Sequence, residues 1–297
     1  MTLKLSCDLA YFGAPEAIRD VAQAAEDLGY DSLCFSEHVA VTTDTPLPPG
    51  FSRDDPWHES MTFAAYVAAV TSRIEITTSM MLLPLRPTVL AAKQAAEIDL
   101  LSGGRLRLGV SVGWNEPEVA ALGQNPRERG ARLEEQVEVM RLLWTESEVN
   151  YEGRFHDLTG VAIHPRPNRR IPLWMGAGGF ARGVPTDGAP TDRALRRIAR
   201  FADGYKMMAP LGLHPEKARD TAERLRAYVR EAGRPEEAVG IEARLLTQVV
   251  PEEKWRDVLE EWSKAGATYL GLGNRIVGGT PDDQIAALAH AMNVLRG

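Results

Sequence analysis

The chain has 297 residues, 44% of them hydrophobic and 25% charged, so it can bury a large core and is not expected to be disordered. Its 34 Lys and Arg face 41 Asp and Glu, giving a formal net charge of −7, and this acidic balance without a basic run argues against nucleic acid as a partner. No apolar stretch approaches the about 18 residues of a membrane span, so no membrane partner is expected.

The sequence contains two cysteines, Cys7 and Cys34, and both lie in apolar, strand-like runs. We therefore expect reduced cysteines in the core, as in proteins of a reducing compartment. The N-terminal residues Met1–Leu5 lead directly into a strand pattern, without the charged and apolar regions of a secretion signal. Together these features predict a soluble cytoplasmic protein.

Strand-like runs and segments with helical spacing alternate along the chain. Leu3–Leu9 is predicted as a buried strand, and Pro15–Leu28 has helical spacing before Gly29, a residue type that commonly follows a helix. The next predicted strands are Ser32–Phe35, Ile74–Met80, Leu106–Val112, Ile171–Met175, Gly204–Met208, Gly240–Val249 and Tyr269–Leu272. The predicted helices between and after them are Ser60–Val70, Pro87–Leu101, Arg132–Trp144, Arg193–Phe201, Pro215–Glu231, Glu252–Lys264 and Asp282–Leu295.

This alternation favours a sheet of parallel strands covered by helices, the arrangement of an α/β protein. About eight strand–helix units in a chain of this length fit a (β/α)8 TIM barrel with insertions. We therefore predict that residues 1–297 form one barrel domain. The alternative is an open, doubly wound sheet with a small second domain.

Three segments interrupt the alternation. Val39–Trp57 and Gly176–Thr191 follow predicted strands, so in a barrel both would lie at the carboxyl-terminal face, where active sites are found. Glu146–Arg170 contains Pro165 and Pro167 and is expected to pack as an excursion of the same domain.

Ser36, Glu37 and His38 follow the second predicted strand directly, so His38 would point into the mouth of a barrel. The pKa of histidine is near neutral, which suits proton transfer. A histidine held by hydrogen bonds in a structural role is the alternative on these residues alone. The other histidines are scattered, without the spacing of a zinc site, so no metal is predicted.

The run Gly176–Ala181 matches a loose dinucleotide fingerprint, but Gly183 and Pro185 stand where the helix of that motif should continue. Glycine-rich backbone can still approach a phosphate, and the N-terminus of a following helix would add its dipole. A flexible loop is the alternative. Trp114 and its polar neighbours, at the end of the fourth strand, would wall a flat ligand or else pack against the next helix.

Three pieces of sequence keep a recognisable order between Leu3 and Tyr205: SLCFSEHV, VTSRIEITTSMMLLPLRPTVLAAKQAAEIDLLSGGRLRLGVSVGWNEPE, and IPLWMGAGG followed by ALRRIARFADGY. They resemble the luciferase-like monooxygenase superfamily, and within it most the branch of oxidoreductases that use the deazaflavin coenzyme F420. The fold that this resemblance implies is a (β/α)8 barrel with insertions, in agreement with the count of elements.

The resemblance also implies roles for particular residues. His38, preceded by Glu37, would lie beside the ring of the cofactor, and the peptide bond between Ser79 and Met80 would be cis and form a bulge behind that ring. Asn115 and Glu116 are implied at the edge of the ring or at the cofactor tail. The residues implied near the cofactor phosphate are Gly176, Ala177, Gly178 and Gly179.

Two features depart from the family pattern. The segment after Gly176 is longer and richer in glycine and proline than the short loop of the family. Aromatic residues that often follow the histidine are absent, and Trp57 or Trp114 would take their place.

The implied activity is hydride transfer between F420 and an unidentified small-molecule substrate, with His38 handling the accompanying proton or a developing oxyanion. Tyr11, Phe12 and the Val39–Trp57 loop would shape the substrate pocket. The first alternative is a monooxygenase that uses reduced FMN and oxygen, with a separate reductase as partner. The second is a barrel that binds a ligand without turnover. A homodimer is compatible with each of these hypotheses.

Overall fold

The structure is a computed structural model that describes residues 3–9, 13–45, 47, 52–178, 180–181, 184–185, 189–208, 215–273 and 279–297. Within these residues, parallel strands pair in the order β3-β2-β1-β13-β12-β11-β8-β5-β4, and a pairing between β3 and β5 closes the sheet. Because β4 continues β3 after a short break, the closed sheet has eight barrel strands. The predicted (β/α)8 barrel is confirmed, and the open doubly wound sheet is wrong.

The barrel strands are β1 (Lys4–Asp8), β2 (Ser32–Phe35), β3 (Glu75–Thr78), β4 (Met81–Leu82), β5 (Leu106–Ser111), β8 (Leu173–Ala177), β11 (Gly204–Met207), β12 (Gly240–Leu246) and β13 (Tyr269–Gly273). The helices are α1 (Pro15–Asp27), α2 (Ser60–Val70), α3 (Thr88–Leu101), α4 (Glu116–Ala121), α5 (Arg129–Thr145), α6 (Asp192–Phe201), α7 (Pro215–Glu231), α8 (Trp255–Lys264) and α9 (Pro281–Arg296).

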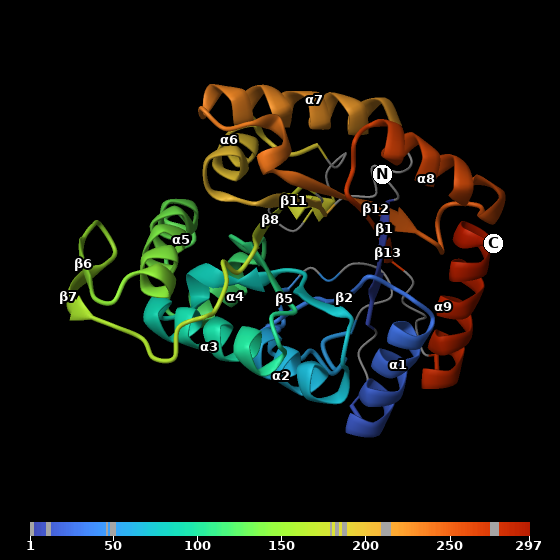
Figure 1. The fold of residues 1–297 in the computed structure, drawn as a ribbon, viewed down its shortest axis with the longest axis horizontal. Coiled ribbons are helices and arrows are strands. Elements are labelled where there is room, and N and C mark those ends of the chain that lie inside the picture. The colour runs from blue at the N-terminus through green and yellow to red at the C-terminus, as the bar shows by residue number, and fades with distance from the viewer. Residues whose placement is uncertain are drawn as a thin grey trace.

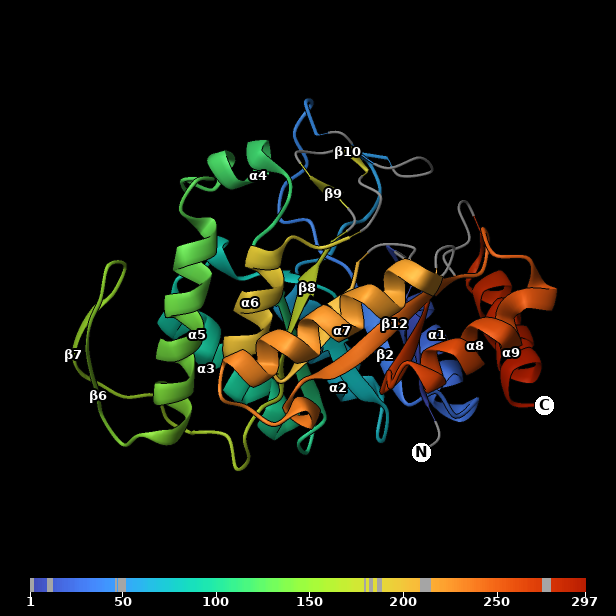
Figure 2. The ribbon, with the colours of Figure 1, turned by 90° about the horizontal axis from the view of Figure 1, so that it is seen from above.

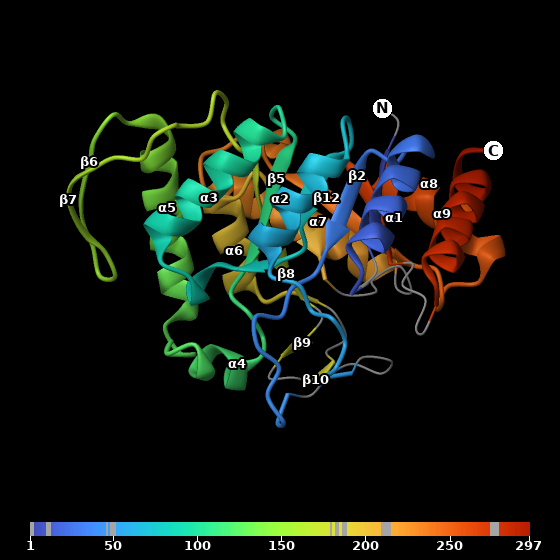
Figure 3. The same cartoon turned by 90° about the horizontal axis from the view of Figure 1, so that it is seen from below.

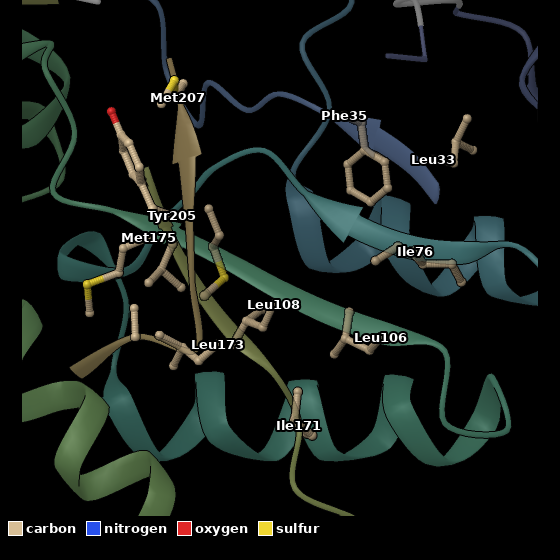
Figure 4. Packing of buried hydrophobic residues seen from close by; sticks show 14 of the residues in the cluster. Leu33, Phe35, Ile76, Leu106, Leu108, Ile171, Leu173, Met175, Tyr205 and Met207 are labelled. Atoms are coloured by element: carbon tan, nitrogen blue, oxygen red, sulfur yellow. The ribbon is translucent and has the colours of Figure 1, made fainter. Parts of the chain in front are cut away.

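The helices pack around the outside of the barrel in the sequence α8, α9, α1, α2, α3, α5, α6 and α7 (Figure 1). Alternate residues of each strand face these helices. Leu106, Leu108 and Leu173 are examples, and all three are completely buried among the hydrophobic side chains between strands and helices (Figure 4). None of the described helices combines the length and the apolar character that a membrane crossing requires.

Local signals set the ends of several helices. Gly29, which follows α1, has a φ of +85°, a conformation that glycine adopts without a steric penalty. Glu59 caps α2 by accepting hydrogen bonds from the backbone of Met61 and Thr62. The predicted and observed ends of most elements therefore agree closely.

Two hairpins were not predicted, and neither were the short helix α4 and the short strand β4. Glu146–Arg170 contains an antiparallel hairpin of β6 (Val149–Glu152) and β7 (Asp157–Val161), which projects from the side of the barrel beside α5 (Figures 1 and 2). A second hairpin, β9 (Phe180–Ala181) and β10 (Val184–Pro185), lies in the glycine-rich loop. The strands of the first hairpin are mostly exposed, and those of the second are two residues long, so neither produces an apolar strand pattern.

The inside of the barrel holds an interior ion cluster, formed by Arg107, Lys206, Glu75 and Glu242. Arg107 donates to Glu75 and to Glu242, each at 2.6 Å, and Lys206 Nζ lies 2.7 Å from the other oxygen of Glu242. Burial opposes the charge of Glu242, but Lys206 and Arg107 outweigh it and lower the pKa of this carboxyl to about 2. The interior below the mouth is thus closed by fixed, mutually paired charges.

Cys34 also faces this interior, with its Sγ 3.1 Å from Nζ of Lys206. Burial raises the pKa of the Cys34 thiol to about 11, although Lys206 opposes the shift. Cys7 and Cys34 are both free and buried, as predicted. Burial also raises the pKa of the Cys7 thiol, so both thiols stay protonated and act as small core side chains.

Candidate active site

The loop after β2, the short helix α4 and the β9–β10 hairpin gather at one end of the barrel (Figures 2 and 3). Each follows the carboxyl end of a parallel strand: β2 leads to Ser36–His38, β5 leads to α4, and β8 leads to β9. This end is therefore the mouth at which barrel enzymes hold their active sites.

Glu118, in the first turn of α4, holds His38 at this mouth. Its Oε2 lies 2.8 Å from Nδ1 of His38, and its Oε1 accepts hydrogen bonds from the backbone N–H groups of Val39 at 2.7 Å and Ala40 at 3.2 Å. The carboxylate of Glu118 is completely buried, and the imidazole is 8% exposed. Because a carboxylate accepts hydrogen bonds, Nδ1 of His38 is the donor to Glu118, and in the neutral imidazole Nε2 then carries the lone pair.

Two tryptophans flank the imidazole with their rings at right angles to it. The centroid of Trp57 lies 4.7 Å from that of His38, and the centroid of Trp114 lies 5.6 Å away, both with interplanar angles of 89°. In the described part of the chain, no hydrogen bond reaches Nε2 of His38. The ring is thus fixed on one side, and its other nitrogen stays available to a bound molecule.

Glu37 turns away from the imidazole and into the protein. Its oxygens accept hydrogen bonds from the backbone of Ser60 at 3.0 Å and Leu82 at 2.8 Å, and both oxygens also pair with the guanidinium of Arg86. Burial disfavours the charge of Arg86, but Glu37 and then Glu59 outweigh it and raise the pKa of Arg86. Protein groups therefore engage both oxygens of Glu37, which favours a positioning role over contact with a ligand.

The peptide bond between Ser79 and Met80 is cis, as predicted. It separates β3 from β4, which is why the predicted strand Ile74–Met80 is divided there. The side chain of Met80 lies against Gly109 on β5 and Gly176 on β8, two inward-facing glycines. A β-carbon added at Gly109 would lie only 2.9 Å from Cε of Met80, and one added at Gly176 only 2.7 Å from its Cγ, so glycine leaves room for Met80 at both positions. Met80 thereby forms an apolar surface across β5 and β8.

Asn115 lies between the loop after β2 and α4. Its Nδ2 donates to Oγ1 of Thr45 at 3.0 Å and lies 3.3 Å from Oε2 of Glu118. Its Oδ1 is buried and has no hydrogen-bond partner in the described part of the chain. Glu116 is half exposed and pairs with Arg129 at 3.3 Å, so it points away from this group.

Gly176, Ala177 and Gly178 continue β8 toward the mouth and are less buried than the strand before them. Gly178 has a φ of +88°, which only glycine adopts readily. The helix whose dipole would support a phosphate, α6, begins only at Asp192, after the β9–β10 hairpin. Phosphate binding by the glycine run, with the N-terminus of the following helix adding its dipole, therefore stays a prediction. Gly179 and the predicted pocket residues Tyr11 and Phe12 lie outside the described residues.

Sequence reasoning missed Glu118 and Arg86. Pro117, a residue suited to the first turn of a helix, is the signal that would have placed Glu118 in such a turn at the mouth. Nothing comparable marks Arg86, because only the folded chain shows where it meets Glu37. Among the described residues, no group of three or more His, Cys, Asp or Glu side chains is arranged to hold a metal ion.

A closed (β/α)8 barrel with an oriented imidazole at its carboxyl-end mouth defines a barrel enzyme. The chain belongs to the luciferase-like monooxygenase family, whose model matches residues 4–293. This membership confirms the predicted resemblance and makes the protein an oxidoreductase.

Curated relatives support the predicted F420-dependent branch of the family. An uncharacterized protein of Mycobacterium tuberculosis is 32% identical over 209 residues, which cover 65% of this chain and 68% of the relative. An F420-dependent glucose-6-phosphate dehydrogenase of Kineococcus radiotolerans is 34% identical over 170 residues, which cover 56% of this chain and 48% of the relative.

Solved structures share the fold over the whole chain. An F420-dependent secondary alcohol dehydrogenase, in complex with an F420–acetone adduct, has a TM-score of 0.75 at 16% identity, with 100% of each chain covered. The coenzyme F420-dependent tetrahydromethanopterin reductase of Methanopyrus kandleri has a TM-score of 0.77 at 16% identity, with 99% of each chain covered. At these identities the likeness shows the fold.

Proposed function

We propose that the protein is a coenzyme F420-dependent oxidoreductase that transfers a hydride between the deazaflavin and a small organic substrate. The observation that carries this proposal is the imidazole of His38, fixed through Nδ1 by Glu118 with Nε2 left available at the barrel mouth. The F420-dependent relative from Kineococcus radiotolerans supports the choice of cofactor.

The residues present fit a flat ring. Met80, lying against the positions of Gly109 and Gly176, supplies an apolar group, and His38 supplies a polar one. The buried Oδ1 of Asn115 is an acceptor that still lacks a partner among the described residues, and it suits a ring or tail N–H or O–H group. The residues that would hold the cofactor are His38, Ser79, Met80, Asn115, Gly176, Ala177, Gly178 and Gly179, with Glu37 as their support.

F420, when bound, supplies the hydride acceptor or donor at its ring carbon C5. The protein supplies orientation and proton handling. Because Nδ1 of His38 donates to Glu118, Nε2 can accept a proton from a substrate hydroxyl, or return one to a developing oxyanion. Trp57 and Trp114 pack against the imidazole and limit its rotation.

Glu37 positions the residues around the cofactor rather than contacting the cofactor itself. Its hydrogen bond from Leu82 ties the segment before His38 to the strand that follows the cis peptide, and Arg86 neutralises its charge. The two sides of the cofactor position are thereby held at a fixed separation.

The alternative is an FMN-dependent monooxygenase supplied by a separate reductase, which the description of the matching family favours. The two activities differ in oxygen use, because the deazaflavin does not readily form an oxygen adduct.

The test is an absorbance titration of the full-length apo-protein with F420 and, separately, with FMN. We expect saturable binding of F420 that is tighter than that of FMN, and no oxygen consumption by the reduced complex. Tighter binding of FMN, with oxygen consumed when reduced FMN is added, would overturn the proposal in favour of the monooxygenase.

A further inference from the structure

An ion pair at the floor of the mouth has no role in the proposed hydride transfer. Nη2 of Arg244, on β12, donates to Oδ2 of Asp8, the last residue of β1, at 3.0 Å. β13 runs between these two strands, and two of its inward positions carry glycine, Gly271 and Gly273. A β-carbon at Gly273 would lie 3.3 Å from Nε of Arg244, so the glycine gives the guanidinium room to cross β13 and reach Asp8.

The exposed part of this pair faces the mouth. Side chains two residues apart on a strand share a face, so Glu242 precedes Arg244 and Ser6 precedes Asp8 on the inward face. Glu242 and Ser6 are both completely buried. The side chains of Arg244 and Asp8 are instead 22% and 20% exposed. Because the buried interior ion cluster lies beneath Asp8 and Arg244, the exposed surface of the pair is turned toward the mouth in the described part of the chain.

Both members of the pair keep unused hydrogen-bonding capacity. A guanidinium has five N–H donors, and a carboxylate has four acceptor positions. Among the described residues, the Arg244 guanidinium donates one hydrogen bond, to Asp8, and its other N–H groups have no acceptor. The charges of the pair sum to zero, as do those of the interior ion cluster beneath it, so the floor has no net charge to attract an anion.

We propose that Asp8 and Arg244 bind a hydroxyl group of the substrate. A hydroxyl donates one hydrogen bond and accepts others, so it can donate to Asp8 and accept from Arg244 at the same time. An oxyanion would satisfy Arg244 but would meet the negative charge of Asp8, which disfavours it. The substrate class is therefore a neutral alcohol, polyol or sugar. The inference rests on the proposed function in taking the mouth as the substrate site.

The experiment uses the folded full-length protein and two matched sets of probes. One set contains neutral alcohols and polyols of three to six carbons, and the other contains carboxylates and phosphate esters of the same carbon skeletons. Binding is measured by ligand-observed NMR in wild type, Asp8→Asn and Arg244→Gln. In wild type we expect neutral probes to bind at least about tenfold more tightly than their anionic partners.

Asp8→Asn keeps the shape of the side chain and leaves Arg244 unopposed. We expect it to lose the preference for hydroxyl compounds and to bind inorganic phosphate at least about tenfold more tightly than wild type does. Arg244→Gln should lose hydroxyl binding without gaining phosphate binding. Asp192→Asn, which alters an exposed Asp–Arg pair with Arg224 on the outer helices, is the matched control and should leave both probe sets unchanged.

Three outcomes overturn the proposal: anions that bind wild type as tightly as their neutral partners, a wild-type protein that binds none of the neutral probes, or binding that neither substitution at the pair changes. The affinity for F420, measured by absorbance on the same samples, tests the proposed function separately. A protein that selects hydroxyl compounds but does not bind F420 would count against the proposed function and leave this inference standing.

Discussion

Two glutamate–histidine pairs in the described part of the chain share a local design, one at the barrel mouth and one at the β6–β7 hairpin. At the mouth, Glu118 accepts from Nδ1 of His38 at 2.8 Å and from two consecutive backbone N–H groups. At the hairpin, Glu135 accepts from Nδ1 of His156, also at 2.8 Å, and from the backbone N–H groups of Arg154 and Phe155.

The pairs differ at the second ring nitrogen. Nε2 of His156 lies 2.5 Å from Oγ1 of Thr88, which in turn accepts a hydrogen bond from Gln136. Nε2 of His38 has no such partner in the described part of the chain. The same carboxylate–imidazole device therefore anchors a hairpin when both nitrogens are satisfied internally, and it presents a reactive atom when one nitrogen is left available.

The largest expected effect separates the two histidines. His38→Ala should lower turnover by about 10²–10⁴-fold, the usual contribution of a positioned acid or base, while F420 affinity stays within roughly tenfold of wild type. His156→Ala should leave turnover unchanged and reduce the free energy of unfolding by about 1.5–3 kcal/mol, because it removes a hydrogen bond to a charged group. Steady-state kinetics, cofactor titration and urea unfolding measure the three quantities.

The contrast fails if His38→Ala turns over at the wild-type rate, since His38 would then be only part of the pocket wall. It fails differently if cofactor binding and turnover collapse together, because the role of His38 would then be structural. Glu37→Gln, which keeps the shape of the neighbouring side chain and removes its charge, tests whether a loss at His38 arises through Glu37.

The next effect concerns the two carboxylates. Both oxygens of Glu118 accept hydrogen bonds, one from the imidazole and the other from the Val39–Ala40 backbone. Glu118→Gln turns one of these oxygens into an NH2 group, which cannot accept, so either the imidazole or the backbone loses its hydrogen bond. We expect kcat to fall about 10–100-fold, the loss typical of a group that orients a functional histidine, with F420 affinity little changed. Glu135→Gln is the matched control: it should lower the free energy of unfolding and leave kcat unchanged. Equal loss of kcat in both variants would remove the distinction.

A smaller effect is expected at Thr88, and it tests whether freeing Nε2 of His156 is enough to make the hairpin pair functional. Thr88→Val removes the hydroxyl that partners Nε2 of His156 and should lower the free energy of unfolding by about 1 kcal/mol. Turnover should not change, because His156 is held by Glu135 and Thr88 and has no contact with His38 or Glu118 among the described residues. Thr88→Ser retains the hydroxyl and should recover most of the stability. A change in substrate turnover in Thr88→Val would show that the hairpin communicates with the mouth.

The order of strands and helices could be predicted because apolar periodicity and glycine or proline at element ends are local features. The strand Ser32–Phe35 and the helix Ser60–Val70 agree with the structure at both ends. The β6–β7 hairpin could not be predicted in this way, since its residues are mostly exposed and are held by contacts with Glu135. Its stability comes from tertiary hydrogen bonds rather than from a strand pattern.

The site was predictable only in part. The location of His38 after β2 was expected from the strand pattern and the cis bond at Ser79–Met80 from the resemblance, and the structure has both at the mouth. The partners of His38 and Glu37 were not, because Glu118 is 80 residues away in sequence from the histidine and Arg86 is 49 residues from Glu37. A linear pattern carries no signal for such pairs.

The smallest expected effect is a pH dependence confined to the hairpin pair. Burial opposes the charge of Glu135, but the hydrogen bonds from His156 and from the backbone of Phe155 and Arg154 outweigh it, so the pKa of Glu135 is lowered in the folded protein. A carboxyl with a lowered folded-state pKa stabilises the fold fully above its unfolded-state pKa of about 4.3, and this stabilisation is lost as the pH falls below that value.

The amide protons of Arg154 and Phe155, which donate to Glu135, should therefore exchange a few-fold faster at low pH, after correction for the intrinsic rate. Hydrogen exchange followed by mass spectrometry between about pH 3 and pH 6, across that unfolded-state pKa, measures the change. In Glu135→Gln, which cannot ionise at this position, the corrected exchange should be fast at every pH and nearly flat. Corrected exchange in wild type that stays constant down to the lowest pH at which the barrel remains folded would show that the ionised carboxylate does not anchor the hairpin, and the comparison between the two pairs would then rest on the imidazoles alone.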